Sequence, residues 1–486
     1  MTTSRELPQT PARPEPFKAG FETYESVFTY RYGSPAMKRT WSRENFWLNV
    51  RDVWIAVAEV QQKAGIVTQE QVDDLKQHRD DLSVERIDEL EKEKGHDVAA
   101  AIAEYSEVAP IGGEIIHNGM TSEDALSNAE VRQIRDSFDI LRPKLIGALE
   151  AFGPRIEENK DLTCVGWTHL QAAEPTTMGY RFAKYAQDLV QDLQIMDFMR
   201  SMIKTKGIKG AVGTSASFTE IFEGTEMTPA EQERIVMNTF GLDAATITDQ
   251  TYPRKSGLIT ETILLHIGQS LHRFALDIQI LQSSAIDEVS EPRRKGQIGS
   301  SAMPHKQNPI HSENIDSLTE LLPGQTFSAW MTAAYVTLER TLRDSAGKRS
   351  SLPESFLIID EALERTKRIV SGMVIHKNSI RTNMEKFGPF FATEIIMAKL
   401  VKAGMDRMEA HSILVEHAET AVEAKREGKP NPLKQLVLSD KRVTNFIKPK
   451  EVSEAFKKAM THTGDAPKAC EDFLKNELYP AIKKAA

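Results

Sequence analysis

Apolar residues recur along most of the chain at the three- and four-residue spacing of an amphipathic helix. The longest uninterrupted pattern lies between Pro253 and Pro292, at Ile259, Ile263, Leu264, Ile267, Leu271, Phe274, Ile278 and Leu281. A helix that fills most of this window would be about 50 Å long. Similar patterns predict long helices over residues 123–158 and 180–205, whereas strand patterns are nearly absent.

These elements predict an all-α protein with three helical domains. We expect an N-terminal helical domain over residues 1–118, a central long-helix bundle over residues 119–375 and a C-terminal helical domain over residues 376–486. Residues 1–20 contain four prolines and no apolar run, which indicates an extended, mobile arm. Because helices of this length bury only part of their apolar surface within one chain, we expect the bundle to continue into other subunits.

Composition and charge narrow the class of function. The net charge is −9 and the two signs are mixed along the chain, which argues against a nucleic acid or a membrane surface as partner. No stretch approaches the roughly 20 apolar residues of a membrane span, so we expect a cytoplasmic protein. Two cysteines, and 12 histidines without the paired helical spacing of zinc enzymes, predict neither a disulfide framework nor a metal site.

Two polar turns near residues 96 and 121 form the first chemically unusual region: Lys94-Gly-His96-Asp97 and His117-Asn-Gly-Met-Thr121-Ser122-Glu-Asp124. Thr121 and Ser122 directly precede the helix expected over residues 123–158. The pattern fits a helix N-cap with an acid in the first turn. The same hydroxyl and N–H groups could bind a carboxylate, so both interpretations stay open.

A second segment reads Gly166-Trp-Thr168-His169-Leu-Gln171-Ala-Ala-Glu174-Pro-Thr-Thr and is expected to be a loop before a long helix. It places an imidazole among hydroxyls, an amide and a carboxylate. A lone histidine is more often structural than catalytic. With Glu174 near enough to orient or charge it, His169 could serve as a general acid.

A third segment, Gly299-Ser300-Ser301-Ala-Met303-Pro-His305-Lys306-Gln-Asn308-Pro309, cannot form a helix because of its two prolines and is predicted to be a loop. One interpretation is a polar surface turn. In the other, a serine close to Lys306 has its pKa lowered enough to accept a proton from carbon.

At this point the chain resembles a known superfamily of enzymes. Ser300–Pro309 is similar to the signature loop of the fumarase, aspartase, argininosuccinate lyase and adenylosuccinate lyase superfamily, and the segments around His96, Thr121-Ser122 and Thr168-His169 follow in that superfamily's order and spacing. The resemblance implies a helical homotetramer whose sites combine loops of three subunits. It also implies β-elimination that releases fumarate, without a cofactor.

Residues 339–349, Glu339-Arg340-Thr-Leu-Arg-Asp-Ser345-Ala-Gly-Lys-Arg349, are similar to the phosphate-binding segment of the adenylosuccinate lyases. Two guanidinium forks and a hydroxyl suit a phosphate dianion, although a solvated charged helix face remains the alternative. The resemblance implies two substrates, adenylosuccinate and succinylaminoimidazole carboxamide ribotide. The chain departs from some of these lyases at Ser215 and Asn314, where they carry glutamine and arginine.

The resemblance also implies roles for individual residues. The catalytic residues would be His169 as the acid, Ser300 as the base with Ser301 as the second candidate, and His96 and Lys306 as assistants. The substrate would be bound by Arg31, Tyr32, Asp97, Thr121, Ser122, Thr168, Gln171, Ser215, Asn308, Arg340, Ser345 and Arg349. The alternatives are another fumarate-releasing lyase of the superfamily, such as an argininosuccinate lyase or a carboxymuconate cycloisomerase, and a helical scaffold without catalysis.

Overall fold

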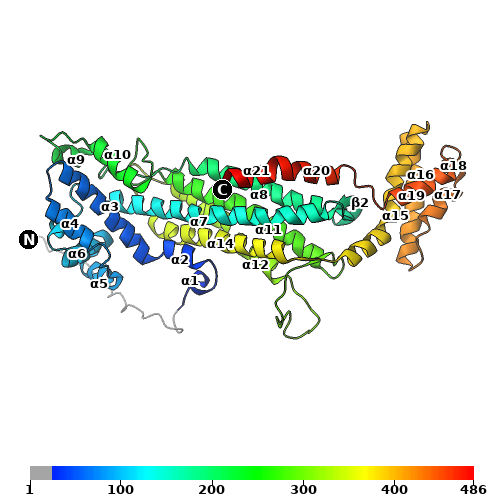
Figure 1. The fold of residues 1–486 in the computed structure, drawn as a ribbon, viewed down its shortest axis with the longest axis horizontal. Coiled ribbons are helices and arrows are strands. Elements are labelled where there is room, and N and C mark those ends of the chain that lie inside the picture. Colours follow the sequence, from blue (N-terminus) through cyan, green and yellow to red (C-terminus); the bar gives the residue numbers. More distant parts are fainter. Residues whose placement is uncertain (1–23, 486) are drawn as a thin grey trace, which may run out of the picture.

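The computed structural model describes residues 24–485 and is an elongated, almost entirely helical molecule (Figure 1). Four long helices lie along its axis and form the central bundle: α7 (Ser122–Asn159), α8 (Met178–Arg200), α11 (Arg254–Gln282) and α14 (Ser345–Gly372). The all-α fold class is thus confirmed. The arm expected over residues 1–20 lies outside the described residues.

The predicted long helices exist, but one of them ends early. The helix expected over residues 180–205 ends at Arg200, because Thr205 instead exchanges backbone hydrogen bonds with Asp243 and Ala245. The helix expected to fill most of the 253–292 window runs from Arg254 to Gln282. The early end at Arg200 accompanies pairing with a distant segment, which a local apolar pattern does not report.

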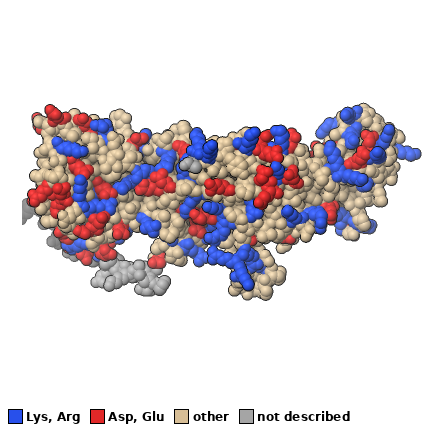
Figure 2. Space-filling view, in the orientation of Figure 1, with Lys and Arg blue, Asp and Glu red and all other residues tan. Residues whose placement is uncertain are grey.

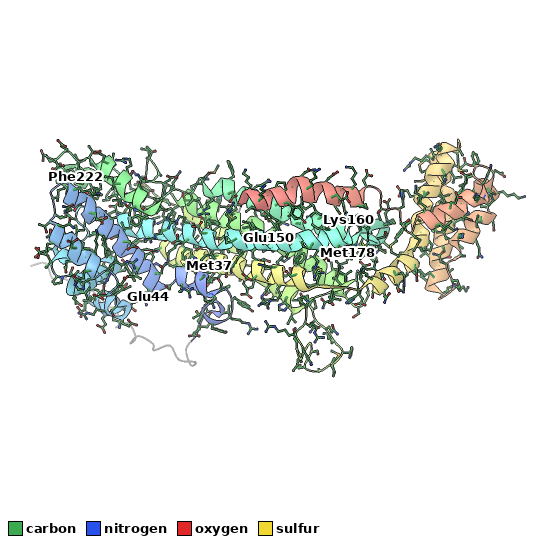
Figure 3. The ribbon with its side chains drawn as sticks, viewed as in Figure 1. Met37, Glu44, Glu150, Lys160, Met178 and Phe222 are labelled. Atoms are coloured by element: carbon green, nitrogen blue, oxygen red, sulfur yellow. The ribbon has the colours of Figure 1, made fainter. Side chains whose placement is uncertain are left out.

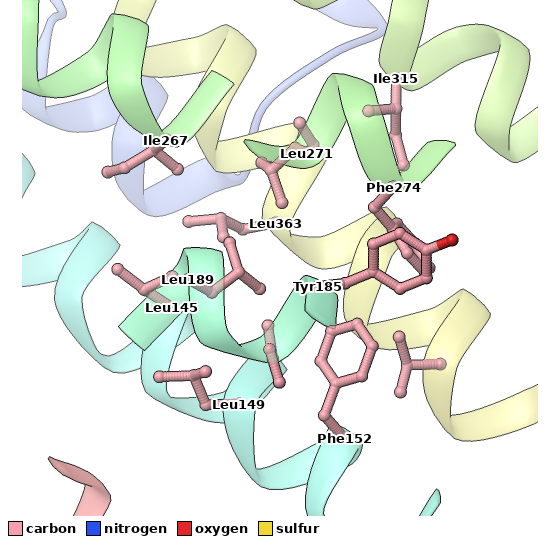
Figure 4. Close-up of a cluster of buried hydrophobic side chains, with 14 of the residues drawn as sticks. Leu145, Leu149, Phe152, Tyr185, Leu189, Ile267, Leu271, Phe274, Ile315 and Leu363 are labelled. Carbon is pink, nitrogen blue, oxygen red and sulfur yellow. The ribbon is translucent and has the colours of Figure 1, made fainter. Parts of the chain in front are cut away.

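The central bundle has an apolar core to which all four long helices contribute. Figure 4 shows Leu145 and Phe152 from α7 meeting Tyr185 and Leu189 from α8, with Phe274 of α11 beside them. The rings of Phe152 and Phe274 pack edge to face, with centroids 5.6 Å apart. Two shorter helices, α12 (Ile310–Thr319) and α13 (Leu322–Ala334), pack on α11.

A second core lies at the N-terminal end. Its helices are α3 (Arg43–Lys63), α4 (Gln69–Gln77), α5 (Val84–Lys94), α6 (Asp97–Val108) and the 3₁₀ turn η1 (Gly112–Ile115). The short helices α1 (Val27–Tyr30) and α2 (Pro35–Thr40) precede it and bury Phe28 and Met37 in the central core instead. Residues from beyond position 200 join the second core, among them Ile208, Phe218 and Val236. They come from the region of α9 (Ala216–Ile221) and α10 (Pro229–Phe240). This core therefore draws on residues on both sides of the expected boundary at residue 118.

The third core is formed by α15 (Lys377–Lys402), α16 (Arg407–Arg426), α17 (Leu433–Ser439), α18 (Lys441–Thr444) and α19 (Pro449–Lys458). The chain then returns to the central bundle through α20 (Ala466–Phe473), the π-helical turn η2 (Leu474–Leu478) and α21 (Tyr479–Ala485). Cys470, Phe473, Leu474 and Leu478 belong to the central core. Residues 466–485 thus pack with the bundle, although the sequence grouped them with the C-terminal domain.

The segment around His169 is a β-hairpin, which corrects the expectation of a loop. Strands β1 (Thr163–Thr168) and β2 (Gln171–Thr177) pair antiparallel, with Thr168 opposite Gln171. His169 and Leu170 form the turn, and both have left-handed backbones with φ of 52° and 57°. The sequence lacks the Asn-Gly or Asp-Gly pair that normally announces such a turn. A second short pair joins β3 (Val289–Ser290) to β4 (Val374–Ile375).

Charges of both signs are interspersed over the face shown in Figure 2. Within residues 24–485 no helix is long and apolar enough to cross a membrane, and no cluster of three metal-ligating side chains occurs.

Candidate functional site

The residues expected to form a site lie in three places along the molecule. One group gathers at the N-terminal end, around the first turns of α6, α7 and α14. A second lies on and beside the loop that projects from the bundle between β3 and α12 (Figure 1). The third is the tip of the β1–β2 hairpin, next to the C-terminal domain.

The first group is built on helix N-termini. His96 caps α6, where its Nδ1 accepts a hydrogen bond from the Ala99 N–H, and Asp97 begins that helix. Thr121 caps α7, and its N–H donates to the Asp124 carboxylate at 2.9 Å. Ser122 and Ser345 are the first residues of α7 and α14. Exposed N–H groups and helix dipoles make such termini favourable for anions.

Two ion pairs connect residues 340–349 to the first group. The Arg349 guanidinium lies 3.4 Å from the Asp97 carboxylate, and Arg340 donates to Glu123 of α7 at 2.7 Å. Gln250 links the same two segments. Its backbone N–H donates to the Glu339 carbonyl, and its side-chain amide donates to the Thr121 hydroxyl at 3.4 Å. The segment expected to bind phosphate thus adjoins the segments of residues 96–97 and 121–122.

A pocket of about 340 Å³ opens between these segments. Asp97, Ser345 and Arg349 line it, together with Lys348 and the aromatic rings of α2 to α3. The Lys348 ammonium is 2.6 Å from the Glu130 carboxylate at the pocket wall. Cations, a hydroxyl and flat apolar rings in one pocket can hold a phosphate and a planar base.

The two acids in the first turn of α7, Glu123 and Asp124, are buried and paired with basic side chains. Burial alone would raise the pKa of Glu123, but Lys348, Arg254 and Arg340 lower it to about 2. Asp124 is fully buried, pairs with Lys206 at 2.7 Å, and accepts hydrogen bonds from the Lys209 and Gly210 N–H groups. Asp124 therefore anchors the glycine-rich turn at residues 207–213 to the start of α7. The N-cap interpretation of the Thr121 segment holds, and it leaves the anion-binding interpretation open.

Ser215 adjoins the same group. It precedes α9 and has a left-handed backbone, with φ of 58°. Two residues on, the Ser217 hydroxyl donates to the Gly119 carbonyl at 2.7 Å, which holds the start of α9 against the turn before Thr121.

His117, to which the sequence pattern assigns no role, also belongs to this group in the structure. Its backbone is left-handed, with φ of 69°, which is uncommon outside glycine. The Trp54 indole N–H donates to its Nδ1 at 3.1 Å. Burial lowers the pKa of His117, with His96 and Lys206 acting in the same direction and Asp124 opposing them. Strained backbone in a polar cluster was the structural signal, and it is invisible in the sequence.

The second group includes the loop predicted over residues 299–309, which the structure shows as irregular backbone. The Ser300 hydroxyl accepts from the Met303 N–H at 3.1 Å, whereas Ser301 and Lys306 are exposed. Lys306 and Asn308 line an open pocket of about 650 Å³ against the ends of α11 and β3. No contact between a loop serine and the Lys306 ammonium occurs within the described part of the chain.

Arg31 and Tyr32 lie close to the point where this loop enters α12. Asn314 in the second turn of α12 donates to the Tyr32 hydroxyl at 3.1 Å. The Arg31 guanidinium sits 5.7 Å from the Tyr32 ring centroid, and Arg365 of α14 approaches the same ring. Asn314, the departure noted in the sequence, thus supports Tyr32.

The third group comprises Thr168, His169 and Gln171, all exposed at the hairpin tip. The hairpin is held by α15, where the Trp167 and Phe387 rings pack edge to face at 5.3 Å. Glu174 faces the C-terminal domain: a hydrogen bond shared with Glu394 of α15, together with partial burial and charge repulsion, raises the pKa of Glu174 to about 7. Glu174 therefore pairs with Glu394, and the structure shows no contact between it and His169.

One chain does not bring the three groups together. In Figure 3, Phe222 marks the end that carries the first group, and Met178, the residue after β2, marks the region of the hairpin. The length of the central bundle separates them (Figure 1). Residues that the resemblance assigns to one site are thus spread along one chain.

Comparison with known proteins defines the class first. The family model described as "Lyase" matches residues 35–322, and the chain is a lyase. A second model, "Adenylosuccinate lyase C-terminus", matches residues 389–473. The chain is 34% identical to an adenylosuccinate lyase of Schistosoma mansoni and covers 96% of it, using 95% of its own length. An adenylosuccinate lyase of Saccharomyces cerevisiae matches with the same three values, and one of Archaeoglobus fulgidus is 32% identical over 88% of this chain and 93% of that protein. This chain belongs to the adenylosuccinate lyase family.

Solved structures share the fold. A fumarate lyase from Mesorhizobium sp. BNC1 superposes with a TM-score of 0.81 at 21% identity, covering 93% of this chain and all of that one. A 3-carboxy-cis,cis-muconate lactonizing enzyme from Pseudomonas putida gives 0.79 at 21% identity, covering 94% of this chain and 98% of that one.

Proposed function

We propose that this enzyme acts in cytoplasmic purine nucleotide synthesis and cleaves two substrates. It converts adenylosuccinate to AMP and fumarate, and succinylaminoimidazole carboxamide ribotide to aminoimidazole carboxamide ribotide and fumarate. The observation that carries the proposal is the pocket where Ser345 and Arg349 meet Asp97 and the start of α7. A phosphate-binding segment serves a nucleotide substrate and has no task in a lyase whose substrate lacks phosphate.

The proposed chemistry removes a proton from a carbon beside a carboxylate and then expels an amine. The carbanion spreads its charge into that carboxylate, so fixed donors must surround the carboxylate oxygens. Ser300, or Ser301, takes the proton from carbon, and His169 protonates the leaving nitrogen. Lys306 and Asn308 bind the charged carboxylate, helped by Thr121 and Ser122. These steps use side chains alone.

The remaining residues hold the rest of the substrate. Arg340, Ser345 and Arg349 bind the phosphate, and His96 assists beside Asp97. Arg31 and Tyr32 hold the nucleotide. Thr168, Gln171 and Ser215 contribute further substrate contacts.

The enzyme works as a homotetramer in which each site combines groups from different subunits. The wide spacing of the hairpin, the loop and the N-terminal group within one chain supports this arrangement (Figure 1). So do exposed apolar side chains on α13 and just beyond it, including Phe327, Trp330 and Leu338, which a partner subunit would cover.

An assay of adenylosuccinate turnover tests the proposal. Ultraviolet absorbance monitors the loss of the substrate, and the release of fumarate is measured alongside it. We expect turnover of adenylosuccinate and none of argininosuccinate or carboxymuconate. Turnover of argininosuccinate instead would assign another lyase of the superfamily. Absence of any turnover by the folded tetramer would leave the scaffold alternative.

A further inference from the structure

Trp54 and His117 form a contact that the proposed chemistry does not use. Trp54 lies on α3, is 2% exposed, and directs its indole N–H at Nδ1 of His117 over 3.1 Å. The two rings are nearly perpendicular, at 85°. An indole nitrogen can only donate, so Nδ1 must carry a lone pair and the ring proton must sit on Nε2.

The indole is itself held by a buried stack. The Tyr105 ring packs on Trp54 at an interplanar angle of 28°, and its hydroxyl donates to the Leu75 carbonyl at 2.6 Å. The Arg51 guanidinium lies over the Tyr105 ring, 3.9 Å from its centroid, and pairs with Glu104. Side chains this tightly packed fix the direction of the indole N–H.

The opposite nitrogen of His117 has no hydrogen-bond partner within residues 24–485. The charged groups that act on the ring are Asp124 of α7, His96 at the cap of α6, and Lys206 in the glycine-rich turn. Two of these three groups belong to the segments around the candidate pocket. A neutral imidazole with a free Nε2–H at this place can donate a hydrogen bond to an anion.

We propose that Trp54 is a positioning residue that holds His117 as the neutral tautomer protonated at Nε2, so that His117 donates a hydrogen bond to an anionic group of the bound ligand. Protonating His117 would place a second proton on Nδ1, facing the indole N–H, and would break this contact. The role in turnover rests on the proposed function, whereas the tautomer does not.

Deuterium exchange at the imidazole C2–H, followed peptide by peptide by mass spectrometry, measures the protonation midpoint of each histidine in the intact, unliganded enzyme. Trp54→Phe keeps an aromatic ring and removes the N–H donor. We expect the His117 midpoint to rise by about 0.5–1 pH unit, because the neutral form loses one hydrogen bond. The acid limb of kcat/KM for adenylosuccinate should move up in pH with it.

Tyr105→Phe is the matched control, because it removes a buried hydroxyl from the same stack and leaves the indole N–H in place. It should lower thermal stability while the His117 midpoint stays where it is. If Trp54→Phe folds poorly, the benzothiophene analogue of tryptophan, introduced at position 54, removes only the N–H and tests the same point.

An unchanged His117 midpoint without the indole N–H, or an equal shift in Tyr105→Phe, would overturn the tautomer assignment. A shifted midpoint with an unmoved kcat/KM profile would overturn the role of His117 in turnover. An enzyme without turnover of adenylosuccinate would instead refute the proposed function and leave the midpoint measurement intact.

Discussion

At the scale of single residues, the proposed phosphate contacts of Arg340 and Arg349 beside α14 can be tested by substitution. Arg340→Ala should weaken adenylosuccinate and AMP together, because a charge-assisted contact in a desolvated site contributes about 2–5 kcal/mol, or roughly 30- to several thousand-fold in kcat/KM. Arg349→Lys should also be poorly tolerated, since lysine keeps the charge but loses the fork. Steady-state kinetics and AMP titration measure both effects.

Arg343→Ala is the control for this pair, because Arg343 lies in the same segment but is exposed and packs over the Tyr335 ring. It should leave AMP affinity unchanged. Arg340 also partners the buried Glu123, so a melting curve must accompany the Arg340→Ala kinetics. Unchanged AMP affinity in folded Arg340→Ala would place the phosphate elsewhere.

The two serines of the projecting loop differ in their surroundings, and substitution separates their roles. Ser300→Ala should lower kcat by about three orders of magnitude or more with little change in AMP affinity, because a general base acts only on the transition state. Ser301→Ala should cost much less. The reverse order would assign Ser301 as the base, and near-normal turnover in both would remove the loop serines from the proton transfer.

Among the elements, the β1–β2 hairpin and α15 share a pH-dependent contact. The raised pKa of Glu174, about 7 against 4.5, means that the folded state binds this proton more tightly than the unfolded chain does. The bound proton on Glu174 therefore stabilises the folded state fully below pH 4.5, and this stabilisation is lost as the pH rises through 7. Above pH 7 both carboxylates of the pair are charged and repel.

Glu174→Gln keeps the hydrogen bond without the charge and should be more stable than the parent at pH 8, by about 0.5 kcal/mol for a solvent-screened pair. At pH 5 the difference should shrink. Urea unfolding at the two pH values measures it, and Glu419→Gln, on the exposed face of α16, is the control that should change neither value. A gain of the same size at both pH values would contradict the shared proton.

At the scale of the whole molecule, the separation of the three groups predicts an obligate oligomer. Light scattering should give about four times the chain mass of 54.5 kDa. Mixing Ser300→Ala with His169→Ala enzyme under conditions of subunit exchange should restore part of the activity, because some sites then combine an intact serine with an intact histidine from different chains. Each variant carried alone through the same exchange is the control. No recovery after verified exchange would mean that one subunit supplies both residues.

Much of the architecture is local and was predictable from the chain. The apolar spacing of Ile263, Ile267, Leu271 and Phe274 places these side chains on one helix face, and the structure buries all four. Residues 299–309 could be predicted as a loop because proline removes backbone donors. The order of the motifs along the chain pointed to the family that the comparisons show.

Tertiary structure decided what depends on residues far apart in sequence. The Trp54 contact that sets the His117 tautomer spans 63 residues, and the Arg349 contact with Asp97 spans 252. The hairpin at His169 forms without a recognisable turn pair, held by α15 more than 200 residues away in the chain. Periodicity and capping act within a few residues, so the sequence by itself determined the long helices and the loop. Hydrogen bonds and ion pairs between distant segments form only once the chain has folded, so only the tertiary structure decided which polar groups meet.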